Sequence, residues 1–233
     1  MSDHIVTAFT DELEQLSGNL LRMGGIAEAM INDTCKAVVT FDQELARAVI
    51  LRDRELDELE TETDRAIVRL FALRNPMASD LRAVLGSIKL AGDIERIGDL
   101  SKNISKRCLR LKGDENRAVL KGLERMGVAV AHQLQTALDA YMQQDARAAV
   151  DVLNRDDDID DHYNSLFRET LTYMMEDPRL ISSGAHLIFM AKNLERIGDH
   201  CTNIAKVVYY QVTGKSAPPE QGSRSAIPPA GGL

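Results

Sequence analysis

A twelve-residue stretch of this chain occurs twice, with equivalent positions one hundred residues apart. The copies run from Asp93 to Ile104 and from Asn193 to Ile204. Between 90–106 and 190–206, nine of the seventeen positions are identical, whereas unrelated segments would share about one at ordinary residue frequencies. The chain is therefore an internal duplication, and we expect two halves built from equivalent elements.

The composition indicates that both halves are helical. Aromatic residues make up 4% of the chain and Trp is absent, whereas strands favour aromatic and β-branched side chains. The abundant Ala, Leu, Glu and Arg are good helix formers. A chain of 233 residues can bury a core without disulfide bonds. We therefore expect an all-α protein.

Apolar periodicity and proline placement predict six long helices. Apolar side chains recur from Phe9 to Phe41 at alternating spacings of four and three, which is typical of a helix in a long bundle. Of the six prolines, Pro76 and Pro178 fall at two expected hairpin turns and the other four lie in the last sixteen residues. The expected helices span about 9–41, 43–74, 79–111, 116–141, 145–175 and 181–212.

These helices predict two three-helix bundles in tandem, which can share one elongated core. The first bundle would span residues 1–113 and the second residues 114–213. A four-helix bundle with extra helices fits a period of three helices less well. The tail, residues 214–233, is rich in Pro, Gly and Ser and has too few apolar side chains to pack, so we expect it to be disordered.

Charge and cysteine content restrict the possible partners and the compartment. A net charge of −8 argues against a sequence-independent grip on nucleic acid, which needs clustered Lys and Arg. No stretch approaches the roughly 20 apolar residues of a membrane-spanning helix, so we expect no direct insertion into a membrane. Cys35, Cys108 and Cys201 are odd in number and form no motif, and we interpret them as buried thiols of a cytoplasmic protein.

Pairs of carboxylates four residues apart are the candidate functional groups. Each repeat carries one pair, and the preceding helix of each half carries another, so each pair lies on one face of one helix. In an antiparallel hairpin, positions equally far from the turn lie level. The eight acids are Asp53, Asp57, Glu95, Asp99, Asp156, Asp160, Glu195 and Asp199.

The two hairpins bring these pairs to the same height. Pro76 is equally far from Asp57 and Glu95, and also from Asp53 and Asp99. The turn at residues 177–178 has the same relation to the four acids of the second half. There, the acids one residue further on form a second pair with the same spacing, so the register stays open. The pair Asp156 and Asp160 is preferred because it aligns with the first-half pair through a preceding apolar residue.

Four carboxylates in each hairpin repel one another unless a cation neutralises them. Two alternatives remain open at this point: ion-pair networks with nearby arginines, or bound metal. The candidate arginines are Arg54, Arg96, Arg155 and Arg196. Oxygen donors favour Mg, Mn, Ca or iron over Zn and Cu, and we keep Fe, Mn, Mg and Zn as candidate metals.

The histidines do not fit a ferritin-type di-iron site, which needs Glu three residues before His. His162 and His200 each follow an acid directly and therefore point about 100° away from it, which indicates structural roles. Gly98 and Gly198 are interpreted as points where a neighbouring helix approaches closely.

The chain lacks the usual signatures of an enzyme. It offers no nucleophile paired with a base, no Gly-rich phosphate loop and no histidine triad. A non-enzymatic regulator is therefore favoured, in which helical faces bind partners. Two alternatives are a metal-dependent phosphoesterase, in which acid-bound cations activate water, and an accessory protein of a different phosphate or ion transporter.

Over roughly residues 5–213 the chain resembles the PhoU family of bacterial regulators of phosphate uptake. The resemblance rests on both Glu-Arg-Ile-Gly-Asp motifs, at 95–99 and 195–199, and on the segments 76–82 and 172–177. It implies tandem three-helix bundles whose E(D)xxxD motifs hold multinuclear metal clusters in some members.

The resemblance also implies a function. Members of this family act as cytoplasmic adaptors, often homodimers, between the ATPase subunit of the phosphate ABC transporter and a sensor histidine kinase. They serve signal transduction and phosphate homeostasis as negative regulators of the phosphate-starvation response. We carry these roles forward as expectations for this chain.

Overall fold

A computed structural model describes residues 2–74, 77, 79–113 and 115–219 of the chain. Within these ranges all regular structure is helical, as the composition predicts. The α-helices are α1 (Ser2–Thr40), α2 (Gln43–Arg74), α3 (Ser79–Cys108), α4 (Arg117–Gln143), α5 (Ala146–Asn154), α6 (Asp156–Glu176) and α7 (Ile181–Thr213), with a 3₁₀ turn, η1 (Pro178–Leu180), before α7.

The helix ends follow from local capping. The side chain of Asp42 accepts a hydrogen bond from the backbone of Leu45 and begins α2, and Asn116 caps α4 in the same way through Ala118. Asp177 accepts from the backbone of Arg179 and begins η1 at the predicted second hairpin turn. The predicted first hairpin turn at Pro76 lies outside the described residues.

One predicted helix is wrong as a single element. The expected helix over residues 145–175 is divided at Arg155 (φ −94°, ψ −4°) into α5 and α6. The three acids Asp156, Asp157 and Asp158 occupy the first turn of α6. Negative side chains are favourable at a helix N-terminus because of the helix dipole, and this preference explains a new helix start at this point.

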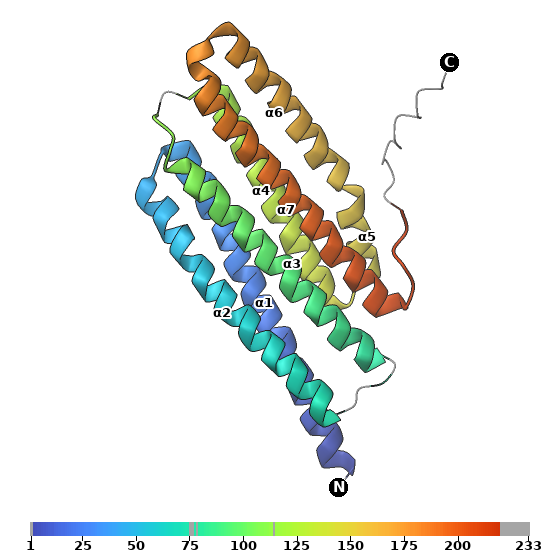
Figure 1. Cartoon of the computed structure of the whole chain (residues 1–233). Helices are drawn as coiled ribbons and strands as arrows, with labels where there is room; N and C mark the ends of the chain where they lie inside the picture. Colours follow the sequence, from blue (N-terminus) through green and yellow to red (C-terminus); the bar gives the residue numbers. More distant parts are fainter. Residues whose placement is uncertain (1, 75–76, 78, 114, 220–233) are drawn as a thin grey trace, which may run out of the picture.

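The helices form two antiparallel bundles that lie side by side as one elongated body (Figure 1). One bundle contains α1, α2 and α3, and the other contains α4, the α5–α6 arm and α7. The bundles meet through α3 against α7 and α1 against α4. One hydrophobic core runs through both, so the halves share their interior.

Burial shows which face of each repeat packs into the core. Ile97 and Ile197, one in each repeat, are both fully buried. The three cysteines, Cys35, Cys108 and Cys201, are buried thiols without disulfide partners. No helix in the described part of the chain has the length and apolarity needed to cross a membrane. Helix α7 ends at Gly214 (φ 69°), and residues 220–233 of the predicted tail lie outside the described ranges.

Candidate functional site

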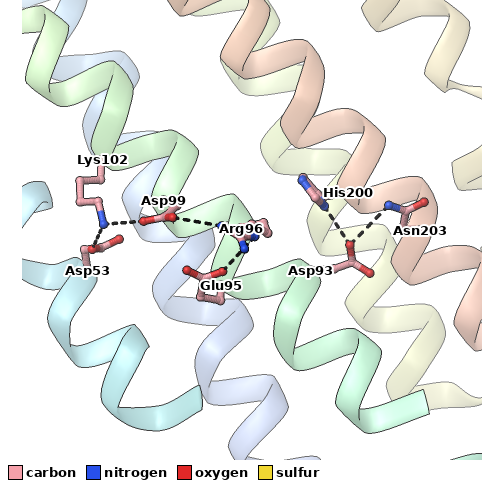
Figure 2. Close-up of polar contacts among 8 residues, drawn as sticks. All are labelled: Asp53, Asp93, Glu95, Arg96, Asp99, Lys102, His200 and Asn203. Carbon is pink, nitrogen blue, oxygen red and sulfur yellow. Dashed lines mark hydrogen bonds and ion pairs between the residues drawn. The ribbon is translucent and has the colours of Figure 1, made fainter. Parts of the chain in front are cut away.

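The first acidic cluster consists of Asp53, Asp57, Glu95 and Asp99, and a lysine binds two of its carboxylates. The ammonium group of Lys102 donates to both Asp53 on α2 and Asp99 on α3 (Figure 2). Asp53 is buried, so its charge needs a partner. The two acids that the hairpin geometry predicts to lie level are therefore joined through one cation, which the sequence pattern did not assign.

Arg96 pairs with two acids of the same cluster, Glu95 and Asp99. Its guanidinium group lies 3.5 Å from Glu95 and 3.6 Å from Asp99 (Figure 2), and the Arg96 side chain is more than half exposed. Burial, and then the charge of Asp99, raises the pKa of Glu95 above its ordinary value, and Asp57 adds to the shift. The acids of the two arms thus act on one another.

Two acids on α2, Asp53 and Glu60, also have raised pKa values. Burial raises the pKa of Asp53, against the lowering effect of the Lys102 hydrogen bond. Burial and the charge of Asp64 raise the pKa of Glu60, which lies about two turns beyond Asp53 on α2. Glu60 was not among the predicted residues, although its position four before Asp64 repeats the acidic spacing.

The second acidic cluster lies between α6 and α7 and contains no equivalent of Lys102. Position 202 is Thr, whose hydroxyl donates to the backbone oxygen of Asp199. Lys192 donates to one carboxylate oxygen of Glu195. The other oxygen, Oε2, is buried and has no hydrogen-bond partner among the described residues. Burial and then the charge of Glu195 raise the pKa of both Asp160 and Asp199.

The predicted register of the acids on α6 is supported by the packing around the repeat glycines. A methyl group added at Gly98 would lie 2.3 Å from Leu56 and 3.7 Å from Asp53. At Gly198, the equivalent contacts are to Ile159 and Asp156, both at 3.3 Å. Equivalent side chains, an apolar residue and an aspartate, thus lie over the glycine in each half. This equivalence supports the alignment of Asp156 with Asp53.

Asp156 has a partner that the sequence did not indicate. The amide of Gln133 on α4 donates to its Oδ1 over 3.1 Å, and the other amide atom of Gln133, Oε1, is buried without a hydrogen bond among the described residues. A polar side chain on the inner face of α4 was the only available signal. Asp156 therefore faces the interior of the second bundle more than Asp160 does.

As they stand, the described residues contain no group of three or more Asp, Glu, His or Cys side chains placed to hold one metal ion. The clusters nevertheless differ in their fit to a cation. Lys192 is paired with Oε1 of Glu195, and the buried Oε2, which has no hydrogen-bond partner among the described residues, is an oxygen donor of the kind that suits a hard divalent cation. In the first cluster, the Lys102 ammonium already lies between the carboxylates.

A polar contact between the halves was also missed. Asp93 of α3 accepts from Nδ1 of His200, 2.8 Å away, and from Asn203, 3.4 Å away, both on α7 (Figure 2). His200 thus turns away from the acids, as predicted, and helps to hold α7 against α3. Its position could only be inferred once these helices were known to pack antiparallel.

The chain matches known proteins along most of its length. The PhoU domain family matches residues 20–108 and 123–208, one match to each half. The phosphate-specific transport system accessory protein PhoU homolog of Caulobacter vibrioides is 47% identical over 92% of this chain and 94% of its own length. The homolog of the same description from Rhizobium meliloti is also 47% identical, over 91% of this chain and 90% of its own.

Solved structures agree. The crystal structure of PhoU from Pseudomonas aeruginosa has a TM-score of 0.84 and 38% sequence identity, and it covers 89% of this chain and 100% of its own. The phosphate transport system regulatory protein PhoU from Streptococcus pneumoniae has the same TM-score at 28% identity. With a duplicated fold, two acidic motifs and matches to both halves, the chain belongs to the PhoU family.

Proposed function

We propose that this protein is an accessory regulator of bacterial phosphate uptake. The observation that supports this most is the near-complete correspondence with the Caulobacter relative, which covers 92% of this chain and 94% of its own. That relative is named an accessory protein of phosphate-specific transport, and the Streptococcus structure is named a regulatory protein of the same system. An accessory and a regulatory protein are both non-enzymatic descriptions, which supports a non-enzymatic role.

In this role the protein is a cytoplasmic homodimeric adaptor that contacts the ATPase subunit of the phosphate ABC transporter and a sensor histidine kinase. When phosphate is plentiful, it represses the phosphate-starvation response. The outer arm α6 supports such contacts because Phe167, Leu171 and Met175 form an exposed apolar stripe along it. Apolar side chains spaced four apart on a helix are the usual anchors for a groove or helix of a partner.

A co-precipitation experiment tests the adaptor role. The protein is expected to retain the transporter ATPase and the kinase at physiological salt, and Leu171→Gln should weaken retention. Val128→Gln is the matched control because Val128 is an exposed apolar residue on a different helix, α4. Retention of neither partner, with or without phosphate and divalent cation, would overturn the proposal.

We also propose that the acidic clusters bind divalent cations, with the second cluster as the stronger site. Asp160, Glu195 and Asp199 would supply the oxygens there, after side-chain rotation, with Asp156 beside them. A bound cation would offset the burial and the repulsion from Glu195 that raise the pKa of Asp160 and Asp199, and it would tie α6 to α7. In the first cluster, Asp53, Asp57, Glu95 and Asp99 could bind a cation only after Lys102 is displaced.

A further inference from the structure

The duplication creates two related grooves between α3 and α7, and only one of them has no acidic residue in its lining. The basic groove, about 420 Å³, is lined by Asn103, Lys106, Arg107, Arg110 and Asn193. The related groove, about 490 Å³, contains the equivalent residues Asn203, Lys206 and Asp93, and it is also lined by Lys89 and Arg96. The equivalences follow from the offset of one hundred residues between the repeats.

Three differences give the basic groove its charge. Asp93 is replaced by Asn193, which removes a negative charge from the lining. Where the second repeat has Val207 and Tyr210, the first has Arg107 and Arg110, which add two positive charges. None of the lining residues of the basic groove is acidic.

The charges of the two grooves are balanced differently. In the related groove, Arg96 is paired with Glu95 and Asp99, and Asp93 lies in the lining. In the basic groove, none of the three cations forms an ion pair with another residue that the structure describes. Three adjacent cations without such a partner repel one another, and an anion in the groove would relieve this repulsion.

The negative end of the α3 helix dipole offsets only part of this positive charge. Lys106 and Arg107 lie in its last turn, where cations stabilise the helix dipole. The dipole supplies roughly half a negative charge, so more than two positive charges are left over. The net charge of −8 does not cancel them at a distance, because exposed charges more than about 8 Å apart are screened at physiological salt.

Arg107 is held in place at the groove. Its guanidinium carbon lies 4.3 Å from the ring centre of Phe189, and its Nη1 donates to Nδ1 of His186 over 3.4 Å. A guanidinium fixed by an aromatic ring keeps its remaining N–H groups available as a fork for two oxygens of a phosphate group.

We propose that the basic groove binds a ligand through a phosphate-type oxyanion. Lys106, Arg107 and Arg110 balance its double negative charge, and the amides of Asn103 and Asn193 donate to its oxygens. Three of the five residues that line this concave site are cations. Such a site fits one compact dianion better than it fits the flat surface of a protein partner. The proposal depends on this groove alone and is independent of the regulatory role.

Isothermal titration calorimetry in a phosphate-free buffer tests the site on the full chain. Inorganic phosphate and adenosine monophosphate serve as soluble probes. Lys106→Gln and Arg107→Gln should each weaken binding about tenfold, because a hydrogen bond to a charged group is lost. Lys206→Gln, the same charge change at the equivalent position of the related groove, should leave binding unchanged. Equal losses at Lys106 and Lys206 would overturn the proposal.

Asn193→Asp is the sharpest variant, because it puts the acid of the related groove into the basic one. It should weaken binding at least as much as Arg107→Gln, with an unchanged melting temperature as the sign of an intact fold. Unaltered binding in Asn193→Asp would place the anion elsewhere and contradict the assignment.

Vesicle flotation separates the two sources of a phosphate group. Phosphatidylcholine vesicles with and without phosphatidic acid are compared with the soluble probes. Binding of the soluble probes identifies a free phosphate compound, and binding of the phosphatidic acid vesicles alone identifies a lipid headgroup; both support the site if Arg107→Gln removes them. Binding of neither overturns it. The pKa of His186, measured by proton NMR, is a second readout. Burial, Arg107 and Arg110 lower this pKa in the free protein, and Glu115 opposes them. An anion beside Arg107 should therefore raise it.

Discussion

The two acidic clusters have the same backbone origin and different means of neutralising their charge. In the first, the Lys102 ammonium joins Asp53 and Asp99 across two helices. In the second, the equivalent position is Thr202, and Glu195 keeps a buried oxygen without a partner among the described residues. The first cluster therefore has a lysine that joins acids of two helices, whereas the lysine of the second, Lys192, pairs with Glu195 on its own helix and leaves one carboxylate oxygen available to a cation.

The largest expected effect comes from removing that side chain. Lys102→Met leaves the buried Asp53 without its cation and should lower the free energy of unfolding by about 3 kcal/mol, as for one partner lost from a buried ion pair. Urea denaturation at neutral pH measures the change. Adding Asp53→Asn to Lys102→Met should recover most of the loss. If Lys102→Met is as stable as the wild type, the ammonium contributes nothing and the contrast between the clusters fails.

Divalent cations should distinguish the clusters almost as strongly. At a concentration a hundred times the dissociation constant, Mg²⁺ or Mn²⁺ stabilises the fold by about 2.7 kcal/mol, or roughly 5–10 °C in melting temperature, and chelator reverses the shift. Asp160→Asn with Asp199→Asn should abolish the response.

The matched control is Glu95→Gln with Asp99→Asn in the first cluster, which should leave the response in place. Conversely, Lys102→Thr should create a second cation response, since it gives the first cluster the residue of the second. A melting curve indifferent to cation and chelator in the wild type, with no metal found by elemental analysis, would leave ion pairs as the full account.

A smaller contrast is expected at the repeat glycines. An added methyl at Gly98 would lie 2.3 Å from the buried Leu56, whereas at Gly198 the nearest atoms are 3.3 Å away. Overpacking costs about 1–3 kcal/mol, and both changes gain the same helix propensity of about 1 kcal/mol. Gly98→Ala should therefore be less stable than Gly198→Ala by about 1–2 kcal/mol in urea denaturation. Equal stabilities would show that Leu56 moves aside freely.

The smallest expected effect is on pH dependence. Asp160 and Asp199 have raised pKa values in the fold, so the folded state binds protons more tightly than the unfolded state. In metal-free protein, the contribution of these two acids to stability should therefore grow as the pH falls towards the ordinary carboxyl pKa of about 4, by less than ~1 kcal/mol because water screens these groups. Saturating Mg²⁺ should reverse the sign, since protons then compete with the cation. Melting curves of wild type and Asp160→Asn with Asp199→Asn compare the two slopes.

Much of the fold followed from the sequence because helical periodicity and hairpin turns act locally. The repeats predicted the equivalent halves, and the turns predicted which acids would lie level, as the shared contact of Asp53 and Asp99 with Lys102 confirms. The break at Arg155 was missed because the apolar stripe continues across it from Val152 to Ile159. Three consecutive aspartates after Arg155 were the available sign of a helix start.

The details of the clusters could not be predicted in the same way. Helical spacing fixes where a Cβ lies, but the position of the Lys102 ammonium depends on four further rotatable bonds. The contact of Asp93 with His200 required the packing of α3 on α7, which joins segments over one hundred residues apart. Whether the clusters hold metal stays a prediction, since it depends on side-chain rotations and on the ion.

The shared interior has a consequence for how this protein folds. Each helical hairpin closes over a short loop and can form quickly, but the contacts of α3 with α7 and of α1 with α4 join parts of the chain far apart in sequence, and such long-range closure is slow. The rate should therefore be set by the docking of two nascent hairpins. A fragment containing one repeat would expose apolar surface that its twin now covers, so the duplicated copies have become a single cooperative unit.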